Sequence, residues 1–343
     1  MEQTSQDPLH NPLASQPIRK LLPKFAIPSI ISFVVSALYN IVDQIFIGQG
    51  VGQLGNAATT VAFPLVTICT ALALLLGVGS ASNFNLRMGE GKREEAARIA
   101  GTGLSTIVIS GVILAALVLI FLEPILELFG ATDNNRGFAI TYTRITALGY
   151  PLVIFSTAAS QLIRSDGSPT YSMICQLSGA VLNTVLDYVF VFPLGMGFAG
   201  AAWATVLGQL LSALLAFRYF FHFKAFPITR ALLLPRRACI RAVTALGAAA
   251  CFNQLAMMLV QVTMNNTLTY YGSRSIYGED IPLACVGVIT KVNTILMGIL
   301  IGTAQGCQPI VGFNYGAKNY PRVRKTYLTG AVIVTVVSVI AFA

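Results

Sequence analysis

Two aspartates in the middle of apolar runs are the residues of this sequence that most need a chemical explanation. Asp43 is the only charged residue between positions 25 and 48, and Asp187 is the only one between 170 and 193. Both runs are long enough to cross a bilayer as a helix of about 20 residues. A carboxylate at such a depth costs at least about 2.5 kcal/mol and usually marks an ion or proton pathway. The two residues therefore predict a cation site inside the membrane.

Polar residues accompany both aspartates at matching depth. With a rise of about 1.5 Å per residue, Asp43 lies about 7 Å from the span end at Gly48, and Asp187 lies about 9 Å from Pro193. Residues three or four apart share one helix face, and three spans offer such a polar pair: Asn40 with Asp43, Asn183 with Asp187, and Thr205 with Gln209. Tyr39, beside Asn40, is a further supporting candidate.

These side chains admit two readings. Oxygen atoms at one depth can coordinate a hard cation such as Na⁺, or hold a carboxyl group that takes up a proton. Alternatively, Asn40, Thr205 and Gln209 join helices through hydrogen bonds and bind no ion. This second interpretation explains the amide and hydroxyl side chains better than it explains the two aspartates.

The elements that position these residues are long apolar helices. The 343 residues are 55% hydrophobic and only 10% charged, and the mean hydropathy is +0.73. This composition is typical of an all-α polytopic membrane protein and far from the soluble average. Charges separate nine expected spans: 25–48, 57–84, 99–122, 138–162, 170–193, 199–222, 242–270, 282–312 and 326–343. We expect kinks at the prolines inside spans, with Pro28 in the first.

The basic residues predict the orientation. Of the 22 Lys and Arg residues, 18 fall in the amino-terminal segment and in alternate loops, and this excess marks the cytoplasmic side. The amino terminus is therefore expected in the cytoplasm of a multi-pass cell-membrane protein. The net charge of +9 is explained by this topology, so no nucleic-acid partner is needed.

A weak internal repeat indicates two lobes. At an offset of 225 residues, Gly77 and Gly91 fall opposite Gly302 and Gly316, and Asn40 falls opposite Asn265. Parallel repeats with a site between them are a common transporter plan. We expect a cytoplasmic tail at 1–24, an N-lobe of six helices at 25–222, a cytoplasmic linker at 223–241 and part of a second lobe at 242–343.

Three segments resemble one transporter family. They are YNIVDQIFIG in the first span, LNTVLDYVFVFPLGMGFAGAAWATVLGQ across the fifth and sixth, and QGCQPIVGFNYGAK after the eighth. In this order and spacing they resemble the multidrug and toxic compound extrusion (MATE) transporters, nearer the branch of the DinF-like and MepA-like exporters. The resemblance runs from about residue 20 to the end.

The resemblance implies a function and a site. It implies twelve helices in two six-helix lobes, acting as a monomer, and export of cationic or amphipathic organic compounds in exchange for Na⁺ or H⁺. The family's cation site falls on Asp43, Asn183, Asp187 and Thr205, and its bending first helix on Pro28. The last span, with 18 residues, ends in an apolar run, so we expect a chain truncated by three helices.

Three alternatives remain. A lipid-linked glycan flippase of the related superfamily would line its cavity with several Lys or Arg residues, whereas Lys291 is the only such residue deep in these spans. Lys291 is then either a snorkelling lysine beside Asn293 and Thr294 or a cavity charge near the substrate.

The second alternative, a membrane enzyme, would need a nucleophile with a base or a metal-ligand set such as His-Glu-x-x-His. No such set, cofactor motif or paired cysteine spacing occurs in the sequence. The third alternative is a non-functional fragment of a transporter.

Overall fold

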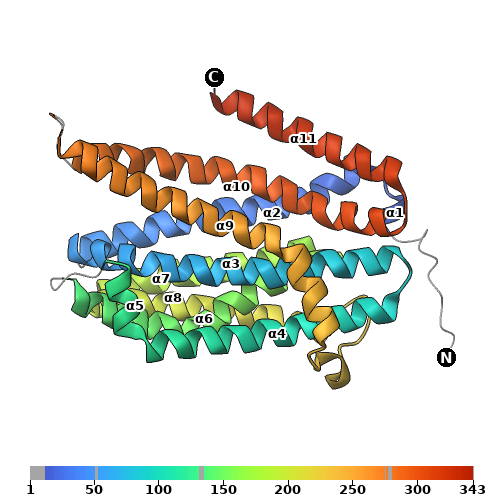
Figure 1. The fold of residues 1–343 in the computed structure, drawn as a ribbon, viewed down its shortest axis with the longest axis horizontal. Coiled ribbons are helices and arrows are strands. Elements are labelled where there is room, and N and C mark those ends of the chain that lie inside the picture. Colours follow the sequence, from blue (N-terminus) through green and yellow to red (C-terminus); the bar gives the residue numbers. More distant parts are fainter. Residues whose placement is uncertain (1–11, 51–52, 131–134, 275, 277–279, 343) are drawn as a thin grey trace.

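The protein is a bundle of long helices. The computed structural model describes residues 12–50, 53–130, 135–274, 276 and 280–342, and this part is helical with no strand. Its long helices run side by side (Figure 1), and nine of them in the described residues are long and apolar enough to cross a membrane. The predicted all-α polytopic fold is confirmed.

Helix bounds follow the expected spans but extend past most of their ends. The helices are α1 (Pro12–Ser15), α2 (Ile18–Gly50), α3 (Gln53–Gly89), α4 (Arg93–Ile120), α5 (Leu122–Leu128), α6 (Arg136–Ser165), α7 (Pro169–Val191), α8 (Gly197–Phe220), the 3₁₀ helix η2 (Arg230–Leu233), α9 (Arg237–Gly272), α10 (Asp280–Gly316) and α11 (Tyr320–Phe342).

Helix α2 passes through Pro28 without ending. It has 33 residues, including Pro28, which corresponds to about 50 Å of helix and exceeds the roughly 30 Å hydrocarbon core. Proline removes one backbone donor. Around it, the Ser29 hydroxyl donates to Phe25 O at 2.9 Å and the Ser32 hydroxyl donates to Pro28 O at 2.9 Å. These buried hydroxyls therefore bond within the helix on both sides of the proline.

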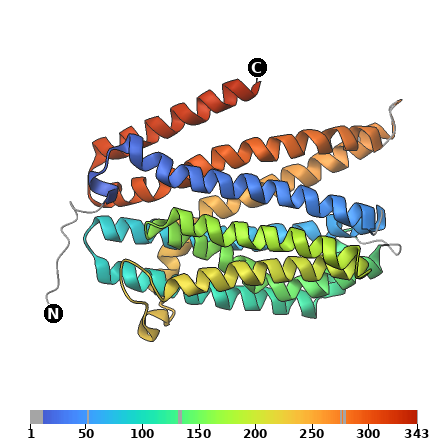
Figure 2. The same ribbon diagram turned by 180° about the vertical axis from the view of Figure 1, so that it is seen from behind.

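The helices pack in two groups. The first group contains α2 to α8, and the second contains α9, α10 and α11. Within the first group, α7 packs along α8, α6 packs along α3 and α8, and α4 lies against α6. The second group joins the first through two long contacts, α10 against α2 and α9 against α3. In both views α10 lies beside α2, and α11 lies on the outer side of α10 (Figures 1 and 2).

Small residues bring α10 close to α2 in one half of the bundle. A Cβ atom built on Gly302 would lie 2.6 Å from Ile30 Cα, and one built on Gly306 would lie 2.5 Å from Ala26 Cα. Only glycine allows backbones to approach this closely. We call this contact the glycine seam. It lies in the half of α2 nearer the basic amino-terminal segment.

Polar bonds accompany this contact between the two groups. Gln308 of α10 donates from Nε2 to Ser82 Oγ of α3 at 2.9 Å. Asn83 of α3 donates from Nδ2 to Ala242 O of α9 at 2.9 Å. The two helix groups are therefore joined by backbone packing and amide hydrogen bonds, and not by ion pairs between the described residues.

The turns that follow α3 and α10 share one backbone pattern. Gly91 has φ +77° and Lys318 has φ +58°. Gly91 N–H donates to Met88 O, and Lys318 N–H donates to Tyr315 O, each three residues back; the next N–H in each turn bonds five residues back. This is the Schellman pattern of helix ends. The turn after α6 has the same hydrogen bonds, from Gly167 N–H to Arg164 O and from Ser168 N–H to Ile163 O, so this pattern does not test the predicted offset of 225.

Candidate cation site and interlobe cavity

Asp43 of α2 and Asp187 of α7 form the centre of the site. Their carboxyl groups lie within hydrogen-bonding reach of each other. Asp187 is fully buried, with 0% exposure. Oδ1 of each aspartate is buried and has no hydrogen-bond partner among the described residues. Two carboxylates in contact repel each other unless a proton or a cation lies between them, so this pair can hold either.

Asn183 connects the pair to α8. In one orientation of its amide, Nδ2 lies 3.5 Å from Thr205 Oγ1. In the other, the nitrogen donates to Asp187 Oδ2 at 3.3 Å and the oxygen accepts from Thr205 N–H at 3.1 Å. The second orientation satisfies both ends of the amide, which is how such an amide is assigned. The Thr205 hydroxyl donates to Ala201 O at 3.0 Å, so its oxygen can still accept a hydrogen bond.

A close crossing of α7 and α8 makes these bonds geometrically available. A Cβ atom on Gly208 would lie 2.8 Å from Asn183 Cβ, and one on Gly179 would lie 2.6 Å from Gly208 O. A larger residue at either position would separate the helices. The glycines therefore hold Asn183 of α7 beside Thr205 of α8, as the sequence predicted for these two residues.

Tyr142 of α6 belongs to the site and was missed by the sequence analysis. It interacts electrostatically with both Asp43 and Asp187, and with Tyr39 of α2. Its ring stacks on Phe198 with a centroid distance of 4.7 Å and an interplanar angle of 20°. Tyr39, a predicted supporting residue, also interacts with both aspartates. Two phenol groups therefore lie within electrostatic range of the carboxyl pair.

The other predicted residues lie around this centre. Asn40 is exposed and donates from Nδ2 to Ser36 O at 2.6 Å. Gln209 Oε1 is buried without a hydrogen-bond partner among the described residues and faces Gly149 of α6. Pro28 is about four turns from Asp43 along α2, and Lys291 of α10 is exposed. The structure thus brings together Asp43, Asn183, Asp187 and Thr205, with Tyr39 at their edge.

A cavity of about 370 Å³ lies between the two helix groups. Four helices contribute its lining residues: Phe33, Ser36, Ala37 and Asn40 from α2; Phe63 and Thr67 from α3; Gln254, Met257, Met258 and Gln261 from α9; and Thr290, Asn293, Thr294, Met297, Gly298 and Ile301 from α10. None of these described lining residues is charged. Its volume is at the lower end of small-molecule sites, about 300–1,000 Å³, and its lining mixes apolar side chains with amides and hydroxyls.

The cavity and the carboxyl pair share α2. Asn40 lines the cavity, and Asp43 lies three residues further along the same helix, a rise of about 4.5 Å. No group of three His, Cys, Asp or Glu residues in the described part could hold a metal ion. The two aspartates can hold a cation or a proton, and the adjacent cavity can hold an organic molecule.

Comparisons with known proteins agree with this architecture. The family model described as MatE matches residues 28–189 and 249–343. The chain is 25% identical over 319 residues to a protein named multidrug export protein MepA from Staphylococcus saprophyticus, a match covering 92% of this chain and 68% of that protein. It is 24% identical over 302 residues to the protein of the same name from Staphylococcus aureus, covering 88% of this chain and 65% of that protein.

Solved structures of MATE transporters have a similar fold. A structure described as a complex of the MATE multidrug transporter DinF-BH is 36% identical, with a TM-score of 0.86; the match covers 95% of this chain and 72% of that one. A structure described as the outward-facing conformation of a multidrug resistance MATE transporter is 26% identical, with a TM-score of 0.88, and covers 96% of this chain and 72% of the other. The chain spans about two thirds of the length of these MepA relatives. Because the family model matches well over half of its residues, the chain belongs to the MatE family of multi-pass membrane transporters.

Proposed function

We propose that this protein is a secondary antiporter that exports cationic or amphipathic organic compounds in exchange for Na⁺ or H⁺. The observation that carries the proposal is the contact between Asp43 and Asp187. A pair of carboxyl groups at membrane depth, one buried and one half-buried, is stable when it holds a proton or a cation, and it loses that stability when the ion leaves. Exchange of the ion can therefore drive a change in helix packing.

The cavity between the two helix groups, which we call the neutral cavity because its described lining residues are uncharged, favours an organic substrate. Its methionines and phenylalanines can pack against flat apolar groups, and its amide and hydroxyl oxygens can accept hydrogen bonds from an ammonium group. The relatives named as multidrug exporters and the relative described as a multidrug transporter support the same class. A glycan flippase is less well supported, because none of the described cavity residues is basic.

The glycine seam supports a rocking mechanism for the two lobes. The seam joins α2 and α10 on the side of the basic loops, which the distribution of Lys and Arg places in the cytoplasm. The cavity then lies on the outer side of the closed seam. In this proposal, release of the coupling ion from the aspartates and opening of the seam alternate, so that the cavity faces one side of the membrane at a time.

Removing either carboxyl charge tests the coupling. Asp43→Asn and Asp187→Asn change volume little, but an amide cannot take up a proton and binds a cation far more weakly. In proteoliposomes containing the 343-residue chain, we expect ethidium transport driven by an imposed Na⁺ or pH gradient to fall at least tenfold in both variants. Applying the two gradients separately identifies the coupling ion.

Glu127→Gln provides the matched control. Glu127 is an exposed carboxylate that forms an ion pair with Arg136 at 2.8 Å, and it is far along the chain from Asp43 and Asp187. It should transport at the wild-type rate. Wild-type transport in both aspartate variants, or gradient-independent transport in the wild type, would overturn the proposed antiport.

A further inference from the structure

A second cavity lies near the helix ends that carry the basic loops. Its volume is about 350 Å³, again within the range of small-molecule sites. Its walls come from α1 and α2, the end of α3, the first residue of α4, the turn between α6 and α7, the segment after α8, and α10. We call it the basic pocket. It is separate from the neutral cavity, because the two share no lining residue.

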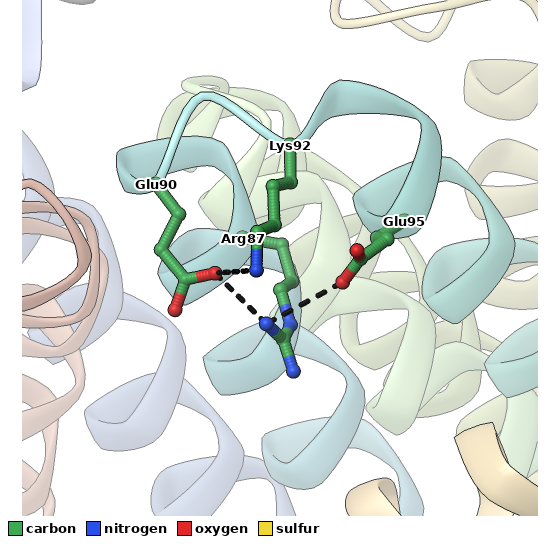
Figure 3. Close-up of polar contacts among 4 residues, drawn as sticks. All are labelled: Arg87, Glu90, Lys92 and Glu95. Carbon is green, nitrogen blue, oxygen red and sulfur yellow. Dashed lines mark hydrogen bonds and ion pairs between the residues drawn. The ribbon is translucent and has the colours of Figure 1, made fainter.

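Neighbouring bases show what an internally neutralised charge looks like in this protein. Arg87 contacts Glu90 at 2.8 Å and Glu95 at 3.4 Å, and Lys92 contacts Glu90 at 3.1 Å (Figure 3). Shared hydrogen bonds with these two bases and their charges lower the pKa of Glu90. The positive charges of Arg87 and Lys92 are thus compensated within the turn between α3 and α4.

The bases of the pocket are exposed and lack such ion pairs, although the charge of Lys224 acts on Asp166. Lys24, Arg93 and Lys224 come from three different elements and all line the cavity. They form no ion pair with a carboxylate of the described residues. Three cationic side chains around one cavity repel each other, and a bound anion removes that repulsion.

The one acid in the lining is already saturated with donors. Asp166 Oδ2 accepts from Tyr219 Oη at 2.8 Å and from Lys224 N–H at 2.7 Å, and Oδ1 accepts from Ala225 N–H at 2.9 Å. These bonds fix the start of the segment after α8 and so position Lys224 at the cavity. Asp166 therefore acts as an anchor for the pocket and leaves an excess of positive charge.

The rest of the lining suits an amphiphile with a phosphate group. Asn85 and Ser165 are buried, with 1% and 5% exposure, and Asn85 Nδ2 donates to Ser165 Oγ at 2.8 Å. An amide carries a second N–H and a serine hydroxyl carries a proton, so both can donate to an anion. Leu13, Phe25 and Phe313 supply an apolar wall.

We propose that the basic pocket binds the phosphate of an anionic amphiphile, the chemistry of a glycerophosphate headgroup. Basic pockets between membrane helices on the cytoplasmic side are suited to such headgroups. Because Phe313 belongs to α10 and the three bases belong to the first helix group and its following segment, an occupant contacts both groups. It therefore favours the packing seen here over one in which they separate.

Binding is tested on the purified 343-residue chain without reference to transport. The protein is placed in nanodiscs of phosphatidylcholine that contain phosphatidylglycerol as the anionic lipid, and native mass spectrometry counts the lipids retained after release. We expect the wild type to retain phosphatidylglycerol, and the triple variant Lys24→Gln, Arg93→Gln, Lys224→Gln to bind it at least tenfold more weakly. The matched control is Lys20→Gln, Arg241→Gln, Lys325→Gln, which removes three exposed bases outside the pocket.

Soluble probes separate the two sources of phosphate. Displacement of lipid by glycerol 3-phosphate supports the pocket as a phosphate site, and binding of glycerol 3-phosphate without lipid retention supports a soluble ligand of the same chemistry. Equal retention in the pocket and control variants would overturn the proposal, as would equal retention of phosphatidylcholine by the wild type. Circular dichroism confirms that each variant is folded, and Asn85→Ala provides a second test that leaves the net charge unchanged.

Discussion

The aspartates of the candidate cation site have partners of two kinds. Asn183 donates to one oxygen of Asp187, whereas the phenol groups of Tyr39 and Tyr142 lie within electrostatic reach of both carboxyls. Fixed dipoles around a buried charge lower the cost of holding it away from water. The site therefore has a neutral polar shell that can serve both the loaded and the empty carboxyl pair.

Residue types explain why part of this shell could be predicted from sequence. Asp43 and Asp187 could be predicted because a carboxylate within an apolar run is costly. Asn183 and Thr205 could be predicted from their depth in the membrane and their helical spacing. Tyr142 could not be found in this way, because an aromatic residue in an apolar helix has the same pattern whether it packs in the core or faces a site. Gln209 satisfied the spacing, yet its oxygen faces Gly149.

Asp166 gives a pH-dependent prediction outside the membrane spans. Burial raises its pKa to about 6, although hydrogen bonds from Lys224 N–H, Tyr219 and Ala225 N–H act in the opposite direction. The ordinary value is about 3.9, so between pH 4 and 6 the folded protein holds a proton that the unfolded chain has lost. The stability from this group is complete below pH 4 and is lost as the pH rises through 6.

The variant Asp166→Asn removes this titration. Between pH 4 and 7 we expect the unfolding free energy of the wild type to fall by on the order of 2 kcal/mol relative to the variant. Thermal unfolding in detergent, followed by circular dichroism at several pH values, measures the difference. Parallel pH profiles for the two proteins would contradict the assignment.

At the scale of helices, the sequence predicted every span but not its ends. The expected first span began at 25, and α2 begins at Ile18; the seventh was expected from 242, and α9 begins at Arg237. Hydropathy detects the apolar part of a helix only. Lys and Arg side chains can extend to the interface while their backbone remains helical, so basic turns such as Arg19–Lys20 continue a helix that hydropathy ends.

The glycine seam predicts an intolerance to side-chain volume. Gly302→Leu places new atoms against Ile30, where even a Cβ would lie 2.6 Å from backbone. Overpacking of this kind costs about 1–3 kcal/mol, so we expect a lower melting temperature in detergent. Gly287→Leu on the same helix is the control, because a Cβ there meets no atom within 4 Å. Similar melting temperatures for both variants would show that α2 and α10 do not pack this closely.

The turns after α3 and α10 predict that adding and removing a glycine have opposite effects on stability. Lys318 has φ +58°, a left-handed conformation that costs a non-glycine residue about 1–2 kcal/mol. Lys318→Gly should therefore stabilise the protein, and Gly91→Ala, at φ +77°, should destabilise it. Chemical unfolding of both variants measures the signs, and destabilisation by Lys318→Gly would contradict the backbone conformation described here.

At the scale of the whole molecule, the proposed orientation makes a labelling prediction. Leu194, in the turn between α7 and α8, is 59% exposed, and Asn319, in the turn between α10 and α11, is also exposed. In a background without the six native cysteines, Leu194→Cys should react with an impermeant maleimide added outside intact cells. Asn319→Cys should react only after the membrane is opened, and the reverse pattern would invert the topology.

The position of α2 between the carboxyl pair and the neutral cavity has a thermodynamic consequence. Asp43 and Asn40 are about one helical turn apart on the same helix, so a ligand at either residue biases the position of α2. Under the proposed antiport, if drug binding changes the affinity for the coupling cation by some factor, the cation must change the affinity for the drug by the same factor, because the two bindings form a closed cycle. Equilibrium titrations of each ligand in the presence of the other must therefore return one common number, whichever ion the protein uses.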